Sequence, residues 1–243
     1  MKPIPTNQNI TTNVIEITSD SGHDIKFQEG TISTKLKTGT TTVGCIIKDG
    51  VIFATDNRAT MGSYVASKDA RKLHQIQPHI YMTIAGGVAD AIYLIDLLKA
   101  ETEIYRLRNS KQIAVSAAAK LLQNILYNKK GFYQVGHILG GYTEAEGSKL
   151  YNIEGYGSIL SEQYTSIGSG SPFALGVLET EWKENLSAED GIHIAVKAVR
   201  SAIIRDIASG NGIDVVVLQK GKAPLEKRYE VDDESLIDGT FKS

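Results

Sequence analysis

The chain has 243 residues, 42% of them apolar, and a formal net charge of -2 at pH 7. This is enough for one large domain with a sizeable core. No basic stripe or block of like charges indicates a nucleic-acid or membrane-surface partner. The single cysteine, Cys45, excludes an intrachain disulfide, as is typical of a reducing compartment. No apolar run approaches the roughly 20 residues of a membrane span.

The N-terminal segment, residues 1–39, is rich in Thr, Asn, Ser and Asp. It lacks the charged region and apolar run of a secretory signal, so we interpret it as a pro-segment that is removed. Its low apolar content indicates that it does not fold alone. A single domain is expected at residues 40–220, and residues 221–243 are expected to form a peripheral C-terminal tail.

The polar leader gives way to the first strongly apolar strand at residues 37–44 (KTGTTTVG). We interpret Thr40 as a nucleophile. A threonine hydroxyl needs a base within hydrogen-bond reach, and the threonine's own α-amino group can act as that base. That amine is locked in the amide with Gly39, so this interpretation requires cleavage of the Gly39–Thr40 bond. The alternative is an ordinary Thr-rich strand, since Thr favours pleated surfaces.

Residues 41–48 and 51–57 are predicted to form two strands that are apolar on both faces. A three-residue loop ending at Gly50, with that glycine in the left-handed conformation, suits the connection. This register would place the Asp56 carboxylate on the same face as Thr40. A slip of one residue would turn it away. The functional interpretation of Thr40 therefore predicts the three-residue loop.

Groups of strands and pairs of helices alternate in the rest of the chain. This order differs from the regular strand–helix alternation of a doubly wound fold and predicts two stacked sheets between two helical layers. A serine N-cap at Ser171, with Pro172 in the first helical position, is expected to start the third helix. The predicted strands are 73–77, 79–85, 134–142, 149–153, 164–167 and 212–219, and the predicted helices are 86–109, 112–128, 171–182 and 188–209.

Two acidic side chains are predicted to lie inside the protein. Asp56 alternates with apolar residues on an inward strand face, and Asp206 continues the apolar stripe of the last helix. Both need partners, because a buried unpaired carboxylate is costly. Lys72 is the candidate counter-ion of Asp56. Alternatively, both carboxylates are structural and Lys72 is a solvated surface lysine. The hydroxyls available to Asp206 or Thr40 are those of Ser169 and Ser209.

Taken together, six features resemble the catalytic β subunit of the 20S proteasome, most closely the archaeal type. The similarity runs from Thr40 to about Gln219. It implies an α+β, N-terminal nucleophile hydrolase fold, in which two antiparallel sheets form a four-layer αββα sandwich with the helices. The features are residues 40–44 (TTTVG), 54–58 (ATDNR), Lys72, 83–86 (TIAG), 168–171 (GSGS) and 205–210 (RDIASG).

The resemblance also implies roles for individual residues. Thr40 would be the nucleophile, freed by autocatalytic cleavage after Gly39, with Asp56 and Lys72 as its principal partners. The Gly86 amide would stabilise the oxyanion. The supporting network would be Ser169, Asp206 and Ser209. The substrate would be bound by Ala59, Thr60, Ala70, His74, Ile84, Val88 and Ile92. Because this pocket holds no carboxylate, it favours a neutral apolar residue before the scissile bond.

Residue chemistry is compatible with these implied roles. A free α-amine titrates near ~7.7, and a nearby Lys72 ammonium would favour its neutral, proton-accepting form. Asp56 would keep Lys72 charged. Gly86 opens a helix, where unpaired amide groups can face a developing oxyanion. We expect neither a metal nor another cofactor, since the histidines of the sequence form no zinc-ligand spacing.

The resemblance further implies several partners and a cytoplasmic location. The partners are other β subunits in a heptameric ring, α-subunit rings, an ATP-dependent unfoldase regulator and unfolded protein substrates. Two alternatives remain. The chain could be an unprocessed, catalytically silent structural β subunit of the same ring, or an amidohydrolase of the same superfamily that acts on a small amide.

Overall fold

The computed structural model of the protein describes residues 39–129 and 132–231. All of these belong to one compact unit, Lys37–Ser243. The expected pro-segment up to residue 38 and the last residues of the expected tail lie outside the described part. None of the helices in the described part is long and apolar enough to cross a membrane.

The first sheet is antiparallel and has the strand order β10-β1-β2-β11-β12. Its edge strand β12 belongs to the segment that the sequence analysis placed after the domain. Charged residues dominate that segment, but Arg228 lies opposite Asp214 of β11 and donates to it at 2.6 Å, a cross-strand pair that favours the pairing. The strands are β1 (Thr42–Ile47), β2 (Gly50–Asp56), β10 (Tyr164–Ile167), β11 (Gly212–Gln219) and β12 (Leu225–Glu230).

The second sheet is also antiparallel, with the order β5-β6-β7-β8-β9. A separate hairpin, β3 (Ala59–Met61) and β4 (Tyr64–Ser67), follows the first two strands. This hairpin and β9 were not predicted, because such short strands carry little periodic signal. The strands of the sheet are β5 (Leu73–Gln77), β6 (Ile80–Gly86), β7 (Val135–Thr143), β8 (Gly147–Glu154) and β9 (Ile159–Ser161).

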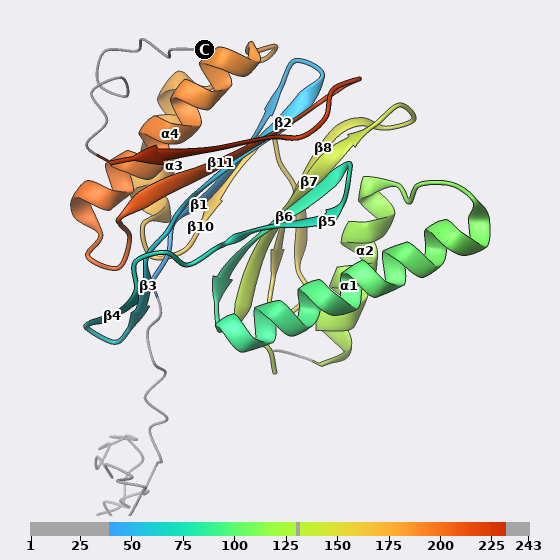
Figure 1. The fold of residues 1–243 in the computed structure, drawn as a ribbon, viewed down its shortest axis with the longest axis horizontal. Helices are drawn as coiled ribbons and strands as arrows, with labels where there is room; N and C mark the ends of the chain where they lie inside the picture. Colours follow the sequence, from blue (N-terminus) through green and yellow to red (C-terminus); the bar gives the residue numbers. More distant parts are fainter. Residues whose placement is uncertain (1–38, 130–131, 232–243) are drawn as a thin grey trace, which may run out of the picture. The chain divides into compact units, whose positions relative to one another are not determined.

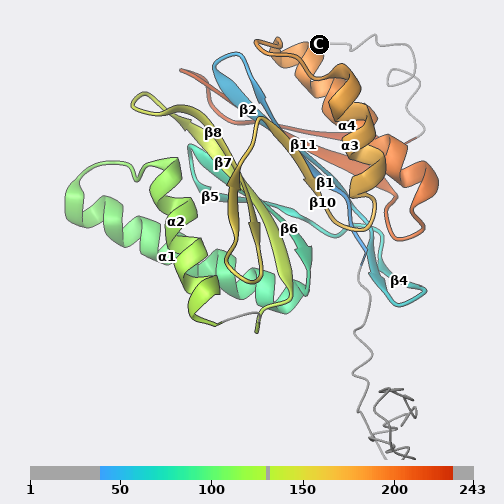
Figure 2. The same cartoon turned by 180° about the vertical axis from the view of Figure 1, so that it is seen from behind.

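Helices cover the outer face of each sheet, as Figures 1 and 2 show from opposite sides. Helices α1 and α2 pack on the second sheet, and α3 and α4 pack on the first. The predicted four-layer αββα sandwich is therefore confirmed. The helices are α1 (Val88–Asn109), α2 (Val115–Asn128), α3 (Ser171–Glu181) and α4 (Ala188–Arg205).

Three apolar clusters hold these layers together, one beneath each helical layer and one between the sheets. The cluster between the sheets includes Phe53 of β2, Tyr81 of β6 and Ile138 of β7, none of which is more than 2% exposed. Removing such side chains from water is the main favourable contribution to folding. The first strands of both sheets are thereby held in fixed positions, and the candidate site lies at their ends.

The predicted loop between the first two strands is wrong. Ile47 pairs with Gly50, which leaves Lys48 and Asp49 as a two-residue connection. The left-handed conformation is taken by Asp49, with φ 56°, and not by Gly50; aspartate is one of the few residues that tolerate it. In this register Asp56 lies beyond the Thr42–Thr55 pair, and its amide donates to the Thr41 carbonyl at 3.1 Å.

The predicted ends of two helices also need correction. Helix α4 stops at Arg205, and Asp206 has extended backbone angles, so Asp206 and Ser209 reach the site from a turn after the helix. Helix α3 begins at Ser171 with Gly170 as its N-cap residue, so Ser171 is not the cap. Helical periodicity cannot reveal where the chain leaves the helix to follow a tertiary contact.

His137, on β7, provides a test of the core that depends on pH. It is fully buried, and its Nδ1 lies 3.2 Å from the Thr83 carbonyl. Because a carbonyl only accepts, Nδ1 carries the proton. Burial lowers the pKa of His137 to about 4.

As the pH falls, the unfolded chain therefore takes up a proton at His137 at a higher pH than the folded chain does. The free energy of unfolding does not depend on the protonation of His137 above about pH 6.5. It decreases as the pH falls from there towards 4, because only the unfolded chain takes up the proton. We expect His137→Asn, which keeps a donor for Thr83 but does not titrate, to lose about 2 kcal/mol less between pH 8 and pH 5 than the wild type. Denaturant unfolding at both pH values measures this difference. Equal losses in both proteins would contradict it.

Candidate active site

A small cavity collects most of the residues that the sequence analysis singled out. It lies where the N-terminal end of the first strand, the β3 hairpin, the start of β5 and the start of α1 meet. His74 and Ile92, although expected to bind the substrate, are not among its lining residues. Arg71 and Ala85 line it but were not predicted. The lining residues are Gly39, Thr40, Ala59, Thr60, Ala70, Arg71, Lys72, Ile84, Ala85, Gly86 and Val88.

Asp56 and Lys72 form a buried ion pair beside Thr40. Lys72 Nζ donates to Asp56 Oδ1 at 2.6 Å, and their side chains are only 6% and 0% exposed. The alternative of a solvated surface lysine is therefore wrong. Asp56 is the last residue of β2 and Lys72 immediately precedes β5, so the pair joins the two sheets.

The Asp56 carboxylate is saturated with donors. Besides Lys72, it accepts from the amide of Thr41 at 2.8 Å, from that of Gly210 at 3.0 Å and from that of Arg58 at 3.1 Å. Full hydrogen bonding is what makes a buried charge tolerable. It also explains how Asp56 belongs to the site despite the corrected register: its position at the strand end lets the carboxylate turn towards the amides of neighbouring segments.

Burial also changes the acidity of Lys72. Loss of water lowers the pKa of its ammonium, and the Asp56 carboxylate partly offsets this effect. A lysine in this position gives up a proton more readily than a surface lysine does. The ion pair holds its amino group at a defined point on the cavity wall, where it can take part in proton transfer.

A second hydrogen-bond network reaches the backbone of Thr40. The Thr40 amide donates to Ser169 Oγ at 3.1 Å, and Ser169 Oγ donates to Asp206 Oδ2 at 2.6 Å. Ser209 Oγ donates to the same Asp206 oxygen at 2.7 Å. Thr41 Oγ1 lies 2.6 Å from Ser209 Oγ. Because the Ser209 hydroxyl already donates to Asp206, the Thr41 hydroxyl is the donor in this pair. The predicted trio of Ser169, Asp206 and Ser209 is thus brought together.

Thr41 was missed as a member of this network. The sequence pattern predicts Thr40, the first residue of the triplet, as the nucleophile. Strand alternation gives no reason to assign a role to Thr41. Its hydroxyl reaches Ser209, which is 168 residues away in the sequence. Such a pairing leaves no local signal.

The glycine-rich loop before α3 packs directly against Thr40. Gly168 has φ +112°, and a β-carbon there would lie 2.1 Å from the Thr40 carbonyl oxygen. Only glycine combines this backbone conformation with so close an approach. The Gly170 amide donates to the same carbonyl at 3.3 Å. The loop therefore holds the backbone of Thr40 in place.

Of the remaining predicted residues, Gly86 lines the cavity, whereas His74 and Ile92 do not. The expectation that Gly86 opens a helix is wrong: Gly86 ends β6 with φ +99°, and α1 begins at Val88 with Gly87 as its N-cap residue. His74, on β5, is partly buried, and burial lowers its pKa. Ile92 lies one turn after Val88 on α1 and is 38% exposed.

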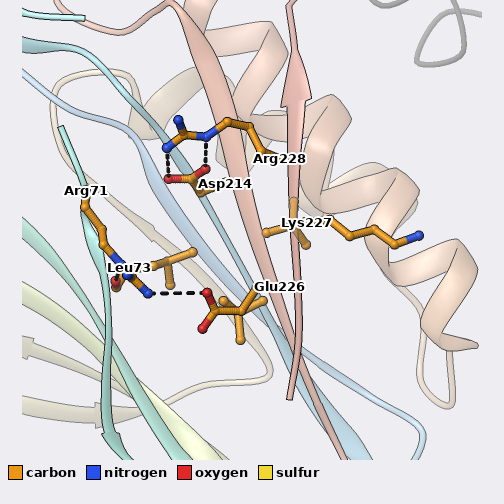
Figure 3. A pocket seen from close by; sticks show the side chains of 8 residues that line it. Arg71, Leu73, Asp214, Glu226, Lys227 and Arg228 are labelled. Carbon is orange, nitrogen blue, oxygen red and sulfur yellow. Dashed lines mark hydrogen bonds and ion pairs between the residues drawn. The ribbon is translucent and has the colours of Figure 1, made fainter. Parts of the chain in front are cut away.

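A larger cavity of about 280 Å³ lies at the open edge between β5, β11 and β12. Figure 3 shows that charged side chains face one another across it. Arg71 Nη2 lies 3.3 Å from Glu226, which also accepts from the Tyr81 hydroxyl at 2.8 Å. Arg228 pairs with Asp214. The Glu226 contacts join β12 to the second sheet, whereas the Arg228–Asp214 pair lies within the first sheet. The smaller cavity, with its hydroxyls and its buried lysine, is the better candidate for catalysis.

Comparison with known proteins identifies the relatives of this chain. Residues 36–218 match the family described as "Proteasome subunit". "Proteasome subunit beta" of Methanocaldococcus vulcanius is 47% identical over 195 residues, covering 79% of this chain and 87% of the relative. The protein of the same name from Haloferax volcanii is 47% identical over 196 residues, covering 81% and 80%. That from Methanosphaera stadtmanae is 46% identical over 193 residues, covering 79% and 93%.

Proposed function

Because this chain belongs to the proteasome subunit family, we propose that it is a catalytic β subunit that hydrolyses peptide bonds through the hydroxyl of Thr40. The observation that carries this proposal is the buried Lys72–Asp56 pair, whose lysine lines the same cavity as Thr40. A purely structural subunit has no need of a buried cation beside a threonine. Replacing such a pair with apolar residues often leaves stability unchanged or improves it.

In the proposed reaction, the Thr40 hydroxyl attacks the substrate carbonyl and its proton passes to the free α-amine of Thr40. Lys72, as a cation, favours the neutral form of that amine, and Asp56 orients Lys72. The Gly86 amide stabilises the negative oxygen of the intermediate. The C–N bond then breaks, and the leaving amine takes the proton. Water hydrolyses the resulting ester and restores the hydroxyl.

The amine must first be freed. In self-cleavage, the Thr40 hydroxyl attacks the Gly39 carbonyl, its proton is transferred to the Thr40 nitrogen, and the Gly39–Thr40 C–N bond breaks to leave an ester. Water then hydrolyses the ester, giving a Gly39 carboxylate and a free Thr40 hydroxyl. The Thr40 nitrogen already lies 3.1 Å from Ser169 Oγ, which donates to Asp206, and these contacts support a role for both residues in holding the new amine. Residues 1–39 are the released pro-segment under this proposal.

The lining of the cavity supports a preference for apolar substrates. Ala59, Ala70, Ile84 and Val88 contribute apolar surface, and Asp56, the nearby carboxylate, is already occupied by four donors. We expect fluorogenic peptides ending in Leu or Tyr to be cleaved at least about tenfold faster than those ending in Arg or Glu, since burying an unpaired charge costs several kcal/mol. Comparison of kcat/KM across the four peptides measures this. A preference for Arg would contradict the assignment of the pocket.

We place this subunit in a ring with other β subunits and with α-subunit rings, supplied with unfolded protein by an ATP-dependent unfoldase in the cytoplasm. The family membership supports assembly into a proteasome core, and the narrow cavity favours extended chains over folded proteins. The backbones of Thr60, Gly86 and Val88 are the proposed pairing partners of an extended substrate.

The decisive test is the intact mass and N-terminal residue of the assembled protein, measured together with peptide hydrolysis. A chain that begins at Thr40 and hydrolyses peptides is the expected result. A chain that assembles with its Gly39–Thr40 bond intact and shows no hydrolysis would instead establish the silent structural subunit.

A further inference from the structure

Gly39, the residue before the proposed cleavage site, is enclosed by segments that are distant in the sequence. Its amide donates to Thr60 Oγ1 at 2.9 Å in a buried hydrogen bond. A β-carbon added to Gly39 would lie 1.8 Å from Ala208 Cβ, 3.0 Å from Ala208 Cα and 3.0 Å from Ser169 Oγ. The first distance is far below any van der Waals contact, so position 39 has no room for a side chain.

A side chain at position 39 would point away from the apolar walls of the cavity. The nearest atoms to such a β-carbon belong to Ala208 and Ser169, and not to Ile84, Val88 or Ala70 of the cavity wall. A side chain at position 39 would therefore point at the turn after α4. The proposed substrate pocket would not receive it.

Ala208 cannot easily move aside, because its turn is tied at several points. The Ala208 amide donates to Asp206 Oδ1 at 3.2 Å, and Ser209 Oγ donates to Asp206 Oδ2 at 2.7 Å. Arg58 Nη1 donates to the Ile207 carbonyl at 2.8 Å. The turn holds the Asp206 network of the site, so displacing Ala208 would also displace catalytic partners.

We propose that the methyl group of Ala208 is the specificity determinant of self-cleavage, restricting the residue before Thr40 to glycine. The inference rests on the proposed function. Self-cleavage then selects its residue by exclusion at Ala208, whereas cleavage of substrates selects by fit in the apolar cavity. One nucleophile thus has two different specificities. Ala208 acts as a positioning residue, since it works through the space beside Gly39 and not through the reacting atoms.

The test is rescue of processing by a compensating substitution in the full chain. Gly39→Ala should slow the appearance of the Thr40 N-terminus by roughly 100-fold or more, since a displacement of about 1 Å at a reacting group can cost that much. Gly39→Ala combined with Ala208→Gly should recover most of the lost rate. Of the three nearest atoms, the double variant keeps only the two at 3.0 Å, and the Ser169 hydroxyl can rotate. Mass spectrometry of timed samples measures the rate.

The matched control combines Gly39→Ala with Ile207→Gly. Ile207 is 81% exposed and adjacent to Ala208, so its replacement loosens the same turn without removing the methyl group. Failure of this control to process, together with rescue by Ala208→Gly, supports the proposal. Equal rescue by both variants overturns it, as does normal processing of Gly39→Ala alone.

A second experiment uses a single variant and so does not depend on the stability of the double variant. Ala208→Val, with Gly39 retained, should slow processing because the larger side chain meets the Gly39 backbone. Unchanged processing in an assembled Ala208→Val particle would overturn the proposal. The wild type distinguishes this failure from failure of the proposed function: a wild-type chain that is cut and hydrolyses peptides upholds that function whatever position 208 does.

Discussion

Thr40→Ala is expected to leave the chain uncut at Gly39–Thr40 and to lower peptide hydrolysis by roughly 10³-fold or more, as removal of a catalytic nucleophile typically does. The reason is that the Thr40 hydroxyl is the proposed attacking oxygen in both reactions. The fold should persist, since the backbone hydrogen bonds from Thr40 to Ser169 and from Gly170 to the Thr40 carbonyl do not involve the side chain. Intact mass, thermal unfolding and fluorogenic hydrolysis measure the three effects.

Thr40→Ser is the matched control for this prediction. It keeps the hydroxyl and removes only the methyl group, which lies beside Gly168 in the structure. We expect it to be processed and to retain part of the activity. Both variants should be produced in a host without other proteasome β subunits, so that no other active site can cut the chain. Normal processing of Thr40→Ala under these conditions would refute autocatalysis by Thr40.

Lys72→Met should have the next largest effect, and it acts on stability and catalysis together. The side chain keeps its length but leaves the Asp56 carboxylate buried without its cation. Breaking a buried pair in this way typically costs about 3 kcal/mol or more. Loss of a group that assists proton transfer should lower hydrolysis and processing by about 10²- to 10⁴-fold. Denaturant unfolding and kcat measurements record the two effects separately.

The double variant Lys72→Met with Asp56→Asn distinguishes structure from chemistry. It removes both charges, so part of the lost stability should return, while activity should stay as low as in Lys72→Met. Recovery of activity along with stability would mean that Lys72 serves only to neutralise Asp56. In that case the proposed role of its charge beside the Thr40 amine would be wrong.

Two patterns in the sequence, apolar strand runs and apolar helix stripes, were sufficient to predict the layers of the fold. Strands such as β2 and β6 are largely apolar runs, and α1 carries a buried stripe from Ala91 to Thr102. These signals are local, because burial repeats with the period of the element itself. Asp56 was identified in the same way, since an acidic residue on an apolar strand face calls for a cation.

The details that decide the site come from contacts between residues far apart in the chain. The Thr40 amide reaches Ser169 across 129 residues, and Thr41 reaches Ser209 across 168. The loop at Asp49 and the end of α4 at Arg205 were predicted wrongly for the same reason. Turn and helix preferences differ by about 1 kcal/mol or less among ordinary residues, and tertiary packing overrides them.

The sequence by itself determined which residues are available for chemistry and on which kinds of element they lie, because residue type and periodicity are written along the chain. Only the tertiary structure decided that Lys72 is buried against Asp56, that β12 pairs with β11 and that Ala208 closes the space beside Gly39. Each of these depends on how two sheets pack. That packing follows from the sum of many distant contacts, and no single segment encodes it.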